Sequence, residues 1–231
     1  MAIGASALDS IGDFSAGLTI TTNSVSPSSN ALVLISIYAR NQASAADPGT
    51  PTVVGNGITY TLIDSQLFDS SRRRHYLFRG LAASPSAGTI VCTWGVNVIG
   101  QVHVVQFTGV DTSGVNGAGA VVQSAKNSAT NTTLSVTLAS FGDATNNASF
   151  GAFMHATNEV TTHEGGYTEL TDLGGTASGM QTEWKTGEDT GVSASWATSS
   201  LCSGIAAEIK MASASTVVQD LIGGGWIPGP R

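Results

Sequence analysis

Short apolar runs, separated by clusters of turn-forming residues, recur along almost the whole chain. Some of these runs alternate apolar and polar residues, which is the pattern of a strand with one buried face. Others are continuously apolar, which is typical of a strand buried on both faces. Gly, Asn, Asp and Pro gather between the runs, and helical periodicity is almost absent. The pattern therefore predicts an all-β fold of many short antiparallel strands.

The expected strands form two groups. The first group is expected at 17–22, 31–40, 58–66, 74–79, 89–94 and 100–107, and the second at 121–125, 133–138, 148–156, 167–172, 180–185, 192–196 and 204–211. Strands of this number and spacing are typical of a β-sandwich or jelly roll.

The order of features in the first group recurs in the second. Five segments match in the same order: 31–40 with 148–157, 57–62 with 165–170, 75–80 with 182–187, 93–94 with 195–196, and 100–107 with 203–210. A repeat of this length is half of a sandwich and not a solenoid unit. It predicts one domain over 1–212 with two similar Greek-key-like halves, about 17–115 and 120–212, packed face to face or side by side. The alternative is that β-sandwiches share strand lengths and turns without any internal repeat.

Two pairs of residues carry further expectations. Trp94 and Trp196 fall at matching positions and are expected to be equivalent aromatic anchors. Cys92 and Cys202 are too few for a disulfide framework, so we expect two buried, reduced thiols.

The strand pattern stops before the end of the chain, and residues 213–231 are predicted to form an extended C-terminal arm. A Ser-rich spacer leads to an apolar stretch with Leu221 and Ile222, and a run of three glycines then precedes a tip with Trp226 and Ile227. An arm of this composition gains order most easily by docking on its own domain or on a neighbouring subunit. These four residues are the predicted partner-binding residues of the arm.

The charge balance excludes one large class of partner. The chain has 9 Lys plus Arg against 16 Asp plus Glu, a net charge of −7, whereas phosphate backbones are bound by basic faces. We expect no nucleic-acid partner, no membrane span and no cleaved secretion signal. Arg72, Arg73 and Arg74 form the only basic cluster. It is interpreted as a contact for an acidic neighbour, such as another copy of the chain, or else as a solvated loop.

No catalytic motif is found, and the sequence predicts no enzyme, no cofactor and no metal site. The densest acidic region, which includes Glu159, Glu164, Glu169, Asp172 and Glu183, is expected to lie on solvated strand faces and loops. His155 and His163 with Glu164 match no metal-binding spacing. His103 is expected to face away from the core, and Asp111 to cap a turn.

Several of these segments together resemble a diffuse group of β-sandwich proteins found among tailed-phage virion proteins and bacterial surface modules. The resemblance covers about residues 17–211 and rests on Ala-Leu-Val-Leu-Ile at 31–35, Gly-Ile-Thr-Tyr-Thr-Leu at 57–62, Val-Val-Gln-Phe-Thr-Gly-Val-Asp-Thr-Ser at 104–113, Gly-Tyr-Thr-Glu-Leu at 166–170 and Ile-Ala-Ala-Glu-Ile-Lys at 205–210. It implies a structural protein of a phage particle, above all a head decoration or cement protein. Such a protein is located in the virion and assembles in the host cytoplasm. The implied partners are the major capsid protein or other virion subunits, and the implied state is a homo-oligomer, with a trimer favoured.

Two other functions remain open at this stage. One is a carbohydrate-binding, lectin-like module or a tail or spike adhesin, with Tyr38, Tyr60, Tyr167 and Trp184 as candidate glycan contacts. The other is a glycan-degrading enzyme, which needs two carboxyl groups converging in a cleft.

Overall fold

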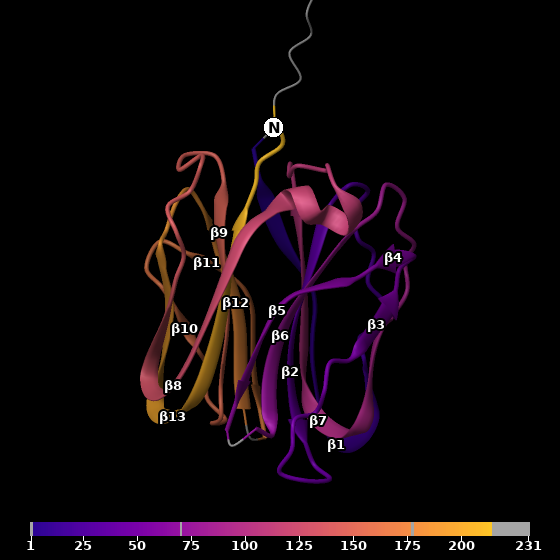
Figure 1. The fold of residues 1–231 in the computed structure, drawn as a ribbon, viewed down its shortest axis with the longest axis vertical. Helices are drawn as coiled ribbons and strands as arrows, with labels where there is room; N and C mark the ends of the chain where they lie inside the picture. Colours follow the sequence, from indigo (N-terminus) through magenta and orange to yellow (C-terminus); the bar gives the residue numbers. More distant parts are fainter. Residues whose placement is uncertain (1, 70, 177, 214–231) are drawn as a thin grey trace, which may run out of the picture.

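The computed structural model describes residues 2–69, 71–176 and 178–213 (Figure 1). In this part of the chain, two antiparallel sheets account for nearly all regular structure, and one short 3-10 helix, η1 (Val115–Ala120), connects them. The predicted all-β sandwich with two similar halves is confirmed.

The first half of the chain forms one sheet, which has seven strands in the described residues. Its path is β4-β3-β7-β2-β6-β5, and β1 lies off this path and pairs with β7. The strands are β1 (Gly4–Thr21), β2 (Leu32–Asn41), β3 (Thr52–Gly55), β4 (Ile58–Thr59), β5 (Thr61–Phe68), β6 (Arg73–Leu81) and β7 (Ile90–Thr108).

The second half repeats this arrangement with six strands in the described residues. Its path is β10-β13-β9-β12-β11, and β8 pairs with β13 as β1 pairs with β7. The strands are β8 (Val121–Thr137), β9 (Ala148–His155), β10 (Thr162–His163), β11 (Thr168–Gly175), β12 (Ser178–Thr186) and β13 (Gly191–Ile209). The order β7-β2-β6-β5 is therefore matched by β13-β9-β12-β11, which is the internal repeat expressed as topology.

The long strands differ most from the sequence-based expectation. β7, β8 and β13 each join two predicted strands, and β1 begins at Gly4, well before the predicted start at residue 17. β1 is an edge strand with several register shifts, and much of it is exposed. Such a strand needs no continuous apolar run, so its first part carries no strand signal in the sequence.

The two central strands, β2 and β9, are buried on both faces. One face of each sheet packs against the other sheet, and this contact forms the inter-sheet layer; the opposite face covers a core inside its own half. The inter-sheet layer joins, among others, Leu32, Leu34, Val105 and Phe107 of the first sheet to Ala148, Phe150, Ala152, Ile205 and Ala207 of the second. The halves are thus packed face to face.

The inter-sheet layer shows that two of the segment matches predicted from the sequence are misaligned by one residue. Leu32 and Leu34 face the other sheet from β2, and Ala148 and Phe150 do so from β9, so equivalent positions are an even number of residues apart. The match of 31–40 with 148–157 has an odd separation and pairs opposite faces, and the match of 100–107 with 203–210 has the same slip. Because side chains alternate along a strand, a slip of one residue exchanges its two faces.

Each half also encloses a core of its own. Trp94 lies in the core of the first half and Trp196 in that of the second, which supports their equivalence. Cys92 and Cys202 are buried in these same two cores as free thiols, and burial raises the pKa of Cys92 to about 12.

The edges of the sandwich bring β5 against β8 and β11 against β1. At the first edge, Lys126 Nζ lies 2.7 Å from Asp64 Oδ1 and donates to the Ser65 carbonyl at 2.8 Å. At the second edge, the buried Gln101 amide donates to the Leu173 carbonyl at 3.1 Å. The two edges are equivalent in topology but are closed by different chemistry.

Candidate functional site

The last described residues of the chain, which we call the arm root (210–213), are held at a fixed point. Val110 and Met211 form an antiparallel bridge, and the Ala212 amide donates to the Gly109 carbonyl at 2.9 Å. Gly109 has a φ of +72°, and a Cβ there would lie only 2.3 Å from the Ala2 carbonyl oxygen. A glycine is therefore required where the two ends of the sandwich domain meet (Figure 1).

An ion pair adds to the arm root. Lys210 Nζ lies 2.8 Å from Asp111 Oδ2, and the Asp111 amide donates to the Lys210 carbonyl at 2.9 Å. Hydrogen bonds from Lys210 and Ser113 lower the pKa of Asp111 to about 2. The Ser113 amide donates to Asp111 Oδ1 at 2.8 Å, so the predicted turn-capping role of Asp111 is confirmed. Because the Lys210 side chain is 45% exposed, the ion pair contributes little energy, and it is the backbone bonds that fix the direction of the chain.

Two hollows flank the arm root. The larger, of about 470 Å³, is mostly apolar and includes Val121, Val122 and Met211 in its wall. The smaller, of about 330 Å³, lies on the other side of Ala212 and is lined by Asn30 and Val110 among others. Val122 is 52% exposed although it is apolar. The arm root therefore lies between two surfaces able to accept apolar side chains.

The predicted arm residues Leu221, Ile222, Trp226 and Ile227 lie outside the described residues.

The predicted basic cluster is described and is engaged inside the chain. Arg72 and Arg73 both approach Asp69 Oδ2, at 3.5 and 3.2 Å, and Arg74 pairs with Asp47. The cluster is therefore neither a fully solvated loop nor three free charges.

A polar layer lies between the two sheets, in the middle of the inter-sheet contact. His75 Nε2 is 2.8 Å from Ser36 Oγ, and its Nδ1 is 3.4 Å from Ser203 Oγ across the interface. His103 Nδ1 is 2.7 Å from Thr171 Oγ1, also across the interface. Serine beside histidine suggests a nucleophile, but all of these side chains are buried and no substrate reaches them.

The two histidines of this layer are held neutral. Burial lowers the pKa of His75 and of His103 to about 3, and the proximity of His103 adds to the effect at His75. His103 does point away from the core of its own half, as predicted, but it faces the second sheet and is fully buried. The sequence gives no sign of this burial at His103, because a polar residue within an apolar strand is more often found on a solvent-exposed face.

The second half holds further polar groups in its interior. Glu183 is fully buried; its Oε2 accepts hydrogen bonds from the Glu164 amide at 3.1 Å and from Gln181 Nε2 at 3.3 Å. Desolvation raises the pKa of Glu183 to about 8 and that of Asp172 to about 6. The prediction of a solvated position is therefore wrong for Glu183, and Asp172 is only partly buried. Turn-rich segments around β12 cover a face that alternation alone marks as exposed.

The histidines considered as metal ligands are engaged otherwise. His155 stacks on Trp196 at 4.8 Å between ring centroids and contacts Thr161 Oγ1 at 3.1 Å, while His163 lies 3.7 Å from Glu169. Within the described residues, no three His, Cys, Asp or Glu side chains are placed to hold a metal ion.

The four aromatic residues proposed as glycan contacts pack inward. Tyr38 and Tyr167 are buried, Tyr60 packs against the core of the first half, and Trp184 packs into the inter-sheet layer. Tyr38 and Tyr167 therefore offer no exposed ring face to a sugar, and Tyr60 and Trp184 are partly buried.

Comparisons with protein families, with curated proteins and with solved structures find no match to this chain. Among the described residues, no helix has the length and apolar character to span a bilayer.

Proposed function

We propose that the protein is a non-enzymatic structural subunit of a phage particle, most specifically a head decoration or cement protein that binds the assembled capsid lattice. The observation that carries this proposal is the arm root. Backbone hydrogen bonds hold the last described residues of the chain against the sandwich, and an apolar hollow adjoins them. A rigid body with a defined exit for an apolar arm suits a protein whose task is to hold neighbouring subunits.

The arm works by burying apolar surface on a neighbour. Full burial of one large apolar side chain contributes about 1.5–3 kcal/mol. Ordering each residue costs about 1–2 kcal/mol, so the four apolar residues of one arm give only a small net gain. Several arms on one symmetric oligomer overcome this limit, because each arm after the first binds at a high effective concentration. The small net gain of a single arm favours a homo-oligomer, for which we propose a trimer. The proposed partner is the major capsid protein.

Binding that is specific for the assembled lattice stabilises that lattice by linkage. The predicted consequence is a particle that resists heat better when the protein is present.

The test compares three chains: the full protein, a chain that ends at Ser213, and the full protein with Leu221, Ile222, Trp226 and Ile227 replaced by serine. We expect all three to unfold at the same temperature. Only the first should sediment with phage heads assembled without it and raise their melting temperature. A full chain with residues 213–216 in scrambled order is the matched control and should behave as the unchanged protein.

Two outcomes would refute the proposal. One is that the chain ending at Ser213 decorates heads as well as the full protein does. The other is saturable binding of the full protein to a glycan array together with no binding to heads, which would favour the adhesin alternative.

A further inference from the structure

At the opposite end of the inter-sheet space from the arm root, three arginines meet. Arg40 near the end of β2 and Arg73 at the start of β6 are cross-strand partners, and Arg72 immediately precedes Arg73. Along β2, Arg40 is two residues from Tyr38, so both side chains leave the strand on the inter-sheet face. We call Arg40, Arg72 and Arg73 the arginine rim.

The rim carries more positive charge than its own surroundings neutralise. Asp69 is the carboxylate that pairs with it, and one oxygen of Asp69 serves both Arg72 and Arg73. Arg74 is a separate case, because it pairs with Asp47. Three guanidinium groups thus face one carboxylate, in a chain whose net charge is −7.

Burial makes this excess charge costly. Arg73 is only 8% exposed and its Nε lies 3.2 Å from Asp69 Oδ2, whereas the enclosed Nε of Arg40 has no hydrogen-bond partner among the described residues. Burial and the charges of Arg72 and Arg73 lower the pKa of Arg40. A buried cation is stable only when an anion or strong acceptors compensate it.

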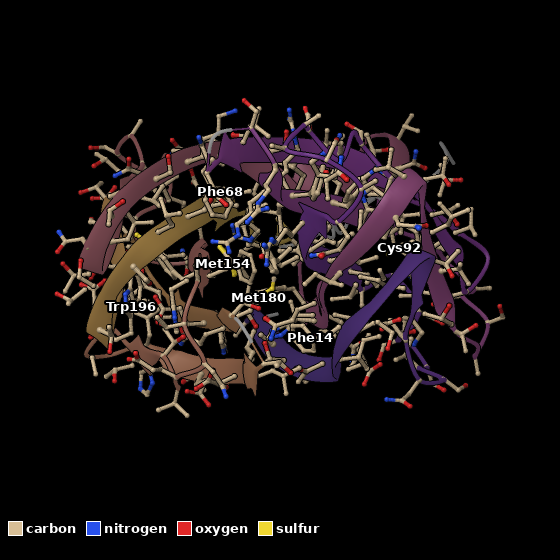
Figure 2. All side chains as sticks on the ribbon, turned by 90° about the horizontal axis from the view of Figure 1, so that it is seen from below. Phe14, Phe68, Cys92, Met154, Met180 and Trp196 are labelled. Atoms are coloured by element: carbon tan, nitrogen blue, oxygen red, sulfur yellow. The ribbon has the colours of Figure 1, made fainter. Side chains whose placement is uncertain are left out.

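The floor beneath the rim is apolar. Tyr38, Phe68, Met154 and Met180 form one buried cluster between the two sheets. Figure 2, seen from below, shows Phe68, Met154 and Met180 near the middle of the molecule, where the halves meet. A low-dielectric floor strengthens the attraction between the guanidinium groups and any anion placed over them.

We propose that the arginine rim binds a phosphate group, held by Arg40, Arg72 and Arg73 together. Planar guanidinium groups donate paired hydrogen bonds that match the oxygens of phosphate, and Asp69 orients two of the three. The phosphate supplies the negative charge that Asp69 alone does not provide for the three guanidinium groups. It lies at the other end of the sandwich from the arm root and does not depend on the proposed capsid role.

The experiment is a calorimetric titration of the full protein with inorganic phosphate, with sodium chloride holding the ionic strength constant, together with thermal melting under the same conditions. We expect saturable binding and a higher melting temperature in phosphate. The variants Arg40→Gln and Arg72→Gln should each weaken binding roughly tenfold or more, because each removes a charged hydrogen-bond donor. Arg74→Gln removes the same charge from the adjacent position, where Asp47 already satisfies it, and should change the affinity by less than about twofold.

A second titration with glycerol phosphate identifies the source of the phosphate. Binding of both ligands indicates a phosphate carried on a larger molecule, and binding of inorganic phosphate alone indicates the free ion; either result supports the site. The proposal is overturned if chloride protects as well as phosphate at equal ionic strength. It is equally overturned if Arg74→Gln weakens phosphate binding as much as Arg40→Gln does.

Discussion

The two halves of the molecule share a strand order but not an interior. The core of the first half is apolar around Val33, Ile35 and Ile37, whereas the second half buries the polar side chains of Glu183 and Gln181 in its interior. The same pairing of strands therefore accommodates two kinds of core. Backbone pairing sets the topology, and this topology tolerates polar groups inside it even though Oε1 of both Glu183 and Gln181 has no hydrogen-bond partner among the described residues.

The halves differ again in what pH does to them. The first half contributes two histidines that are kept neutral at the interface, and the second contributes a carboxyl group that is kept protonated. Each is a group whose charged form the fold disfavours. The histidines destabilise the fold as pH falls below 6.5, and the carboxyl group destabilises it as pH rises above 4.5.

The largest effect is expected where the two halves are joined. Phe107 is fully buried and meets Phe150 and Trp184 edge-on at 5.8 and 5.9 Å between ring centroids. Phe107→Ala should lower the free energy of unfolding by about 3–5 kcal/mol. Urea denaturation followed by tryptophan fluorescence and by circular dichroism measures the change. We expect one coincident transition from both probes; two separate transitions would show that the halves are independent.

The next effect concerns the carboxyl group in the interior of the second half. The pKa of Glu183 is about 8 in the fold and near 4.5 when unfolded, so the unfolded chain releases this proton first as pH rises. Stability contributed by this group is complete below pH 4.5 and is lost progressively up to about pH 8. Glu183→Gln should remove that loss, so that the variant gains roughly 2–5 kcal/mol relative to the unchanged protein between pH 4.5 and pH 8. Melting temperatures across this range test it.

Glu208 provides the matched control in the same half. It is also buried, but its two oxygens accept hydrogen bonds from Gln123 and Asn147 at 2.8 and 2.6 Å. Glu208→Gln should destabilise the fold by about 1–3 kcal/mol at neutral pH. If Glu183→Gln and Glu208→Gln are both stabilised as pH rises toward 8, the prediction that Glu183 alone is kept protonated in the fold is disproved.

The histidines of the first half predict the opposite limb of the pH profile. Their pKa values are about 3 in the fold and near 6.5 in the unfolded chain, so the unfolded chain binds protons first as pH falls. Their stabilising contribution is present above pH 6.5 and is lost as pH falls toward 3. The double variant His75→Gln and His103→Gln should be less stable at pH 7 by about 1–3 kcal/mol, and its stability should depend less on pH below 6.5. An unchanged slope in urea midpoints between pH 7 and pH 4 would contradict this.

The smallest effects compare the two edges of the sandwich. Gln101→Ala removes a buried hydrogen bond to Leu173 and should cost about 1–2 kcal/mol. Lys126→Ala breaks an ion pair whose lysine side chain is 43% exposed and should cost less than about 1 kcal/mol. Chemical denaturation measures the loss in free energy of unfolding for each variant. Equal losses would mean that the different burial of the two contacts does not affect their contribution to stability.

The sequence predicts the strands well where burial alone determines the residue pattern. Apolar runs locate β2, β6, β9 and β12 closely, because these strands lie in the middle of a sheet and are largely buried. The order of those runs was enough to reveal two similar halves. Edge strands were missed or shortened, since β1 and β10 expose many of their residues and carry a weak pattern.

The sites were harder to predict, for a related reason. The sequence marks Arg72, Arg73 and Arg74 as one cluster, but the structure separates Arg74 and adds Arg40, which is distant in sequence. Cross-strand register decides this grouping, and register depends on contacts between strands and not on local pattern. The polar layer around His75 and His103 was missed for the same reason.

The inter-sheet layer has one further consequence. Either sheet alone would present to water the large apolar face that carries Leu34 and Phe107 or Phe150 and Ile205. Each half therefore serves as the cover of the other, and a break in the connecting segment near Val115 should leave two fragments that find and enclose one another again. The two halves of this single polypeptide are therefore expected to associate as two separate subunits would.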